Sequence, residues 1–155
     1  MTTTLTAGVL SVKITESIKL NGKQQGATNI LNISSIKAIS KRIVTVTTTE
    51  ATVLTFGGVM AGGTYVVGDV MYLRFTNLDD TNHIVLTFAN GNDEEVALML
   101  DYGQSFIFNA DNVAGMVGVL DAAGAALTLD LDNLKSVTAD ADSDSCDMEM
   151  FIASV

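Results

Sequence analysis

The chain is a series of short segments in which apolar and polar residues alternate, separated by clusters of Gly, Asn and Asp. Residues 9–15 (VLSVKIT) and 42–47 (RIVTVT) show this alternation, and a period of two is typical of a β-strand that buries one face. The apolar residues are interleaved with many Thr, and β-branched side chains fit a pleated sheet better than a helix. The pattern therefore predicts an all-β chain.

The length and composition predict one folded domain. The chain has 155 residues, of which 48% are hydrophobic and 17% charged, so it has the means to build a single core. About ten short strands separated by turn signals, with no long amphipathic helix, are typical of a β-sandwich, and a jelly roll is one such arrangement. We expect a single β domain over residues 1–155, with residues 1–25 as an extended docking arm.

Four predicted strands follow one another in the centre of the chain. Short turns rich in Asn, Asp and Gly separate them, and strands joined by such turns commonly pair as hairpins. We therefore expect a four-stranded meander. Its strands are residues 70–76, 83–88, 95–100 and 104–108.

Two features concern the first forty residues. Asn21-Gly22 follows a predicted strand, and this dipeptide favours the positive φ angles of a type I′ hairpin turn. Residues 29–40 are ambiguous: their apolar spacing could fit a short helix, but we interpret them as irregular or strand.

Charge is unevenly distributed along the chain. The net charge of -10 argues against a nucleic-acid partner, since phosphate binding needs a cationic face. Residues 1–42 nevertheless carry +5 and residues 43–155 carry -15. One interpretation is that both sets are solvated faces; the other is that the basic segment docks on an acidic surface of a neighbouring copy or lattice. The candidate partner-binding residues are Lys13, Lys19, Lys23, Lys37, Lys41 and Arg42.

Few residues suggest catalysis or metal binding. His83 has no nucleophile motif beside it, so we interpret it as a turn-supporting or surface residue and expect no catalytic residues. Asp140, Asp142 and Asp144 alternate like the start of a calcium loop and are candidates for a weak Ca²⁺ or Mg²⁺ site. Ser145 stands where such a loop needs Gly, so a solvated loop is the favoured interpretation and no cofactor is expected.

The remaining observations favour assembly. Cys146 is the sole cysteine, which excludes an intrachain disulfide, and we expect it to be a small buried hydrophobe. A mean hydropathy of +0.37 is high for a small soluble monomer, and burial between subunits would cover the excess apolar surface. The sequence after Met1 has neither a basic start nor an apolar core, so we expect synthesis in a cytoplasm and no membrane partner.

Residues 72–86 (YLRFTNLDDTNHIVL) and 100–108 (LDYGQSFIF) resemble small virion structural proteins of tailed bacteriophages. The organisation of the whole chain is similar to capsid decoration (cement) proteins of marine phages. The resemblance implies a strand that ends in an Asn-Leu-Asp turn and pairs with the next strand. It also implies a non-enzymatic protein that binds the major capsid protein or other virion proteins on the outer capsid surface, as a homo-oligomer with a trimer favoured.

Two alternatives stay open from the sequence. One is a calcium-dependent carbohydrate-binding or host-attachment β-sandwich module, although the chain has no Trp and only three Tyr to form the aromatic platforms that sugars need. The other is a structural protein of the neck or tail.

Overall fold

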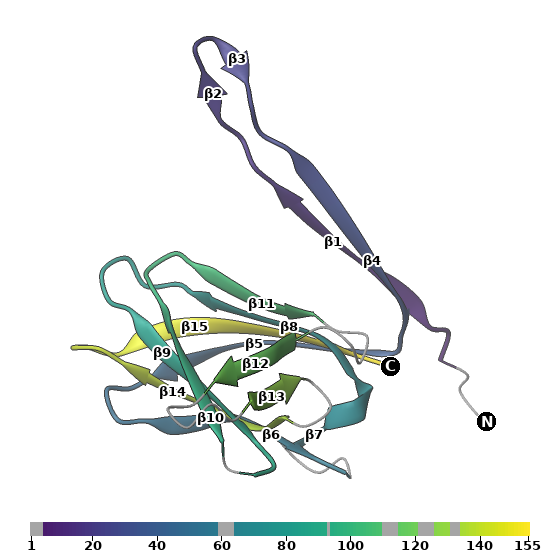
Figure 1. Ribbon diagram of the computed structural model, residues 1–155, viewed down its shortest axis with the longest axis vertical. Helices are drawn as coiled ribbons and strands as arrows, with labels where there is room; N and C mark the ends of the chain where they lie inside the picture. The colour runs from purple at the N-terminus through teal and green to yellow at the C-terminus, as the bar shows by residue number, and fades with distance from the viewer. Residues whose placement is uncertain (1–4, 59–63, 93, 110–114, 121–125, 131–133) are drawn as a thin grey trace.

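The body of the protein is a sandwich of two β-sheets (Figure 1). The computed structural model describes residues 5–58, 64–92, 94–109, 115–120, 126–130 and 134–155. The four-stranded sheet has the order β11-β8-β15-β5 and the five-stranded sheet the order β10-β9-β14-β6-β7. The first comprises β5 (Ala38–Val46), β8 (Val70–Asn77), β11 (Ser105–Asn109) and β15 (Cys146–Ser154); the second comprises β6 (Ala51–Gly57), β7 (Thr64–Val66), β9 (Ile84–Asn90), β10 (Glu95–Leu100) and β14 (Leu134–Ala141).

Eight of these strands form a nested set of antiparallel pairs. The first, β5, pairs with the last, β15; β6 pairs with β14, β8 with β11, and β9 with β10. A long hairpin wound in this way into two facing sheets is a jelly roll. The sequence prediction of an all-β sandwich is therefore confirmed, and β7 adds a short parallel strand beside β6.

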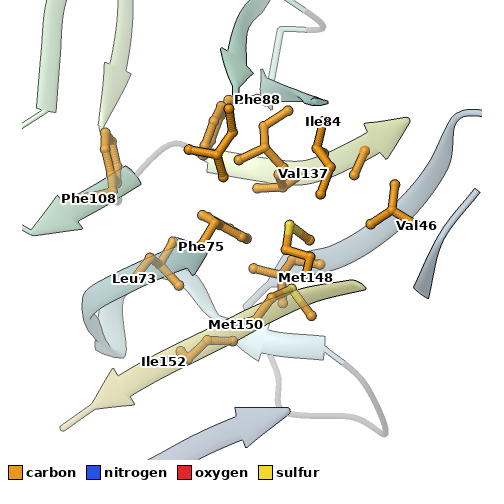
Figure 2. Close-up of a cluster of buried hydrophobic side chains, with 14 of the residues drawn as sticks. Val46, Leu73, Phe75, Ile84, Phe88, Phe108, Val137, Met148, Met150 and Ile152 are labelled. Atoms are coloured by element: carbon orange, nitrogen blue, oxygen red, sulfur yellow. The ribbon is translucent and has the colours of Figure 1, made fainter. Parts of the chain in front are cut away.

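The core lies between the two sheets (Figure 2). Along β15 the burial alternates, because successive side chains of a strand point to opposite faces. The rings of Phe75 and Phe88, one from each sheet, meet edge to face with centroids 5.9 Å apart, a geometry that adds to the stabilisation from burial. The labelled residues of this core are Val46, Leu73, Phe75, Ile84, Phe88, Phe108, Val137, Met148, Met150 and Ile152.

All four strands of the predicted central meander exist, and β9 pairs with β10 as predicted, but its other two pairings are wrong. β8 pairs with β11 and β15, whereas β9 lies in the other sheet between β10 and β14. The segment between β8 and β9 therefore crosses from one sheet to the other. The side chain of Asn77 organises this crossing, because its amide donates to the carbonyls of Asn82 at 2.8 Å and Leu100 at 3.1 Å. The likeness to phage proteins implied the same β8–β9 pairing, which the structure contradicts.

Smaller elements complete the body. β12 (Gly115–Leu120) and β13 (Ala126–Asp130) pair with each other, and a 3-10 turn, η1 (Val67–Asp69), precedes β8. Within the described ranges, no helix is long and apolar enough to cross a membrane.

A long hairpin projects from the sandwich (Figure 1). It consists of β1 (Gly8–Thr15), β2 (Lys19–Leu20), β3 (Lys23–Gln24) and β4 (Thr28–Ile36), and residues 8–36 are called the arm from here on. The sequence placed an extended arm over residues 1–25. In the structure, β4 supplies its second long strand, so residues 29–36 of the ambiguous segment are strand.

Candidate functional site

The tip of the arm is a two-residue turn. Asn21 and Gly22 have φ angles of 50° and 79°, and Leu20 pairs with Lys23 across the turn. Positive φ at both central residues is the type I′ geometry that matches the twist of the flanking strands. The turn predicted from Asn21-Gly22 is confirmed.

A glycine allows the two halves of the arm to join. The long β1–β4 ladder ends at the pair Thr15–Thr28, and the Glu16 amide then donates to the Ala27 carbonyl at 2.8 Å. A Cβ on Gly26 would lie 1.9 Å from the Glu16 carbonyl oxygen, so no other residue fits without moving the backbone. Gly26 therefore fixes the path of the distal arm, residues 16–27.

The root of the arm packs on the outer face of the four-stranded sheet. Leu10, Val12 and Ile33 point to one side of the arm and contact the cluster around Tyr72 and Ala153. Tyr72 faces away from the core between the sheets, yet it is only 4% exposed because the arm covers it. Its burial raises the pKa of the Tyr72 hydroxyl. Apolar contact thus anchors the root.

Further out, the arm leaves aliphatic side chains in solvent. The alternation in β1 predicted one buried face, and this is correct only for the root, because the distal part projects away from the described sandwich (Figure 1). Leu20, near the tip, is 54% exposed. The exposed aliphatic residues of the arm are Val9, Ile14, Ile18, Leu20, Ile30 and Leu31.

Two apolar hollows flank the root. One, of about 280 Å³, lies between the arm and the sheet, and its lining includes Ile14, Leu31, Tyr72 and Ile107. The other, of about 200 Å³, lies where residues 8–11 pass Ile36, Lys37 and Ile39. The exposed surface of the arm is therefore continuous with the outer face of the body.

That outer face ends in an exposed strand edge. β5 is the last strand of its sheet, and its outward side chains Ile39 and Ile43 are 60% and 59% exposed. Asp147, exposed on neighbouring β15, lies opposite Thr45 and accepts a hydrogen bond from its hydroxyl at 2.8 Å. The surface formed by Ile39, Ile43 and Asp147 is called the β5 patch from here on.

A charge network lies beside this patch. Glu149 on β15 accepts hydrogen bonds from Lys41 of β5 and Arg74 of β8, and the Lys41 Nζ–Glu149 Oε2 distance is 2.9 Å. The hydrogen bond from Lys41, followed by that from Arg74, lowers the pKa of the Glu149 carboxyl. Glu149 is therefore already paired within the chain, unlike the outward aliphatic residues.

The six basic residues predicted to bind a partner lie in different parts of the structure. Lys13, Lys19 and Lys23 are exposed on the arm, and Lys37 is exposed at its root. Lys41 pairs with Glu149. Arg42 points inward and donates to the Val53 carbonyl of β6 at 2.6 Å. A docking role for these residues stays a prediction, and the internal bond of Arg42 disfavours it there.

The arm and the rest of the chain have opposite charge. Residues 8–36 hold three lysines and one glutamate, a net charge of +2. Residues 37–155 hold five basic and seventeen acidic residues, a net charge of -12. The arm is thus a cationic, aliphatic projection from an anionic body.

The opposite end of the body gathers acids and the remaining residues noted in the sequence. Asp79 accepts hydrogen bonds from the backbone amides of Asn82 and Thr81, and these bonds lower the pKa of its carboxyl. His83 Nδ1 lies 3.7 Å from the Asp142 carboxylate, at the turn that precedes β9. Cys146 is fully buried, as predicted, and this burial raises the pKa of its thiol.

The candidate metal ligands do not form a site in the structure. Asp140 lies within β14, whereas Asp142 and Asp144 lie in the turn that leads to β15. Among the described residues, no group of three or more His, Cys, Asp and Glu side chains is arranged to hold a metal ion.

Comparisons with known proteins give one structural likeness. No protein-family model matches the sequence, and no curated protein matches it. A chain described with the disulfide-linked pili of Bacillus endospore appendages is similar in structure, with 12% identity over 97% of this chain and 90% of that one. The TM-score is 0.43, too low for the likeness to support an inference about function.

Proposed function

We propose that this protein is a non-catalytic structural subunit that assembles into a larger particle through its arm. The observation that carries the proposal is the set of aliphatic side chains on the arm that stay largely exposed to solvent, such as Leu20 and Ile30. A two-stranded hairpin alone is marginally stable in water, and exposed apolar surface of this kind marks an interaction site. Assembly would bury it.

The jelly roll alone does not decide the role, since this architecture serves capsid proteins, lectins and cupins alike. The resemblance of residues 72–86 and 100–108 to small phage virion proteins supports a more specific proposal. In it, the chain is a capsid decoration protein that binds the major capsid protein on the outer shell and reinforces it, as a homo-oligomer with a trimer favoured. It would be made in the host cytoplasm and end on the particle.

The ligand-binding alternative receives no support from the described residues. Its calcium-dependent form needs Asp140, Asp142 and Asp144 to act together, and they are not arranged as a metal site. A place on the neck or tail, in contrast, would use the same arm and differs only in location.

Immunogold electron microscopy tests the proposal on virus particles purified from cells that make this chain. An antibody against the sandwich should place gold over the outer shell of intact particles. Gold confined to the neck or tail would keep the structural role and overturn the capsid location. Particles free of both gold and the chain, as checked by mass spectrometry, would contradict the virion role.

A further inference from the structure

The β5 patch has the properties of a docking surface for an extended partner. β5 is nine residues long and is the last strand of its sheet, so no other described strand pairs with its outer edge. Exposed strand edges with aliphatic side chains are sites where another β element adds. Ile39, Lys41 and Ile43 share the outward side of β5, so a partner would meet two aliphatic side chains separated by a lysine that pairs with Glu149.

The distal arm carries the complementary pattern. Ile18 and Leu20 are exposed near the tip, Lys19 lies between them in the sequence, and Lys23 pairs with Leu20 across the turn. The β5 patch offers two exposed aliphatic residues beside an exposed acid, Asp147. Aliphatic side chains on both surfaces can be buried together while opposite charges meet at their border, which sets register and orientation.

The charges favour arm-to-body contact between copies over arm-to-arm contact. Two arms, each of net charge +2, repel one another, whereas an arm is attracted to a body of net charge -12. The arm of a given copy projects away from its own sandwich (Figure 1), so its tip is presented outward. Asn21 lies thirteen positions after Gly8, so the arm reaches about 45 Å at 3.4 Å per residue.

We infer that the distal arm of one copy docks on the β5 patch of a second copy, with Ile18 and Leu20 on Ile39 and Ile43 and the tip lysines beside Asp147. This inference rests on the proposed structural role and names its partner as another molecule of the same chain. The contact joins two different surfaces, so it is heterologous, and repetition around an axis closes a ring.

Disulfide trapping between two differently sized versions of the full chain tests the contact. One version carries Leu20→Cys and the other Ile43→Cys with an affinity tag, so a disulfide between them joins two copies by construction. Native Cys146 is fully buried and stays in both. Mild oxidation of the mixture should give the mixed dimer as the main product.

A cysteine on the opposite sheet gives the matched control. Met99 on β10 is 63% exposed, as open as Ile43, but lies on the five-stranded sheet. The Leu20→Cys chain should trap the Met99→Cys chain at least tenfold less than the Ile43→Cys chain, since trapping follows effective concentration. Equal trapping at both positions, or none at position 43, would overturn the inference.

Charge reversal supplies a second measurement that does not depend on disulfide geometry. Replacing Lys19 and Lys23 by Glu should weaken self-association by about tenfold or more, and Asp147→Lys should do the same, as expected for opposed interface charges. Mixing the two variants should restore association, because their charges are then complementary. If association of the mixed variants is not restored, the inference is overturned. The structural role would still stand if the immunogold experiment finds the chain on the particles.

Discussion

Glu149 on β15 lies 2.9 Å from the Lys41 ammonium on β5, and its other carboxylate oxygen bonds Arg74 on β8. One acid therefore ties three neighbouring strands on the outer face of the four-stranded sheet. The register explains the contact with Lys41, because Glu149 pairs with Ile43 and Lys41 lies two residues along the same face.

Glu149→Gln should lower the free energy of unfolding at pH 7 by about 1 kcal/mol, since it removes a charge from a partly buried pair. Because the folded-state pKa of Glu149 is lowered, its contribution is present above its unfolded pKa of about 4.3 and is lost as pH falls through the folded value. Urea unfolding across pH 2 to 7 should therefore show a shallower acid-side loss in the variant. Glu95→Gln on β10 is the matched control, and an equal change in both would contradict the assignment.

Asn77→Ala should be strongly destabilising. The side chain is fully buried, donates to two carbonyls and accepts from the Asp79 amide at 3.0 Å. Its loss leaves buried polar groups without partners, so we expect a decrease of about 3 kcal/mol in unfolding free energy. Chemical denaturation measures it. Asn32→Ala, on the exposed arm, should change the midpoint little; similar effects at both positions would refute the role of Asn77 in the crossing.

Gly26→Ala should disrupt the distal arm without unfolding the sandwich. The added Cβ would collide with the Glu16 backbone, and this contact lies outside the core between the sheets. Hydrogen exchange should show lost protection at the amides of Glu16 and Gln25, whereas amides of β8 and β15 keep theirs. Gly91→Ala meets nothing within 4 Å and is the control. Unchanged protection at Glu16 would contradict the described path of the arm.

Cys146 should resist thiol reagents in the folded protein. Burial raises the pKa of its thiol, and nearby carboxylates add to the effect, so little thiolate forms at neutral pH. Labelling by a chromogenic disulfide reagent should be slow in buffer and fast in denaturant. Fast labelling of the folded chain would mean that the start of β15 opens readily.

Local features of the fold could be predicted from the sequence and long-range pairing could not. The turn at Asn21-Gly22 depends on two residues, so its geometry follows from their φ preferences. The partners of β8 depend on how both sheets bury their faces, which no single segment records. β14 gives only a weak apolar signal in the sequence, because its inward residues include the small Ala139 and Ala141.

The candidate site, too, could be predicted only in part from the sequence. The basic residues and the excess of apolar surface pointed to a docking N-terminus, but the outward aliphatics of β1 and β5 have the same alternation as buried ones. The strand-like residues on both sides of Asn21-Gly22 were a usable signal for one long hairpin. No such signal locates Ile39 and Ile43, since their exposure depends on β5 being an edge.

The most direct test of assembly through the arm is the molar mass in solution, measured by light scattering over a range of concentration. The intact chain is compared with a variant in which Asn-Gly joins Thr15 directly to Thr28, a cross-strand pair that such a turn can close. The intact chain should give a multiple of its 16.3 kDa mass and the shortened chain a single copy. A monomeric intact chain at every concentration, or equal oligomers from both chains, would contradict the account.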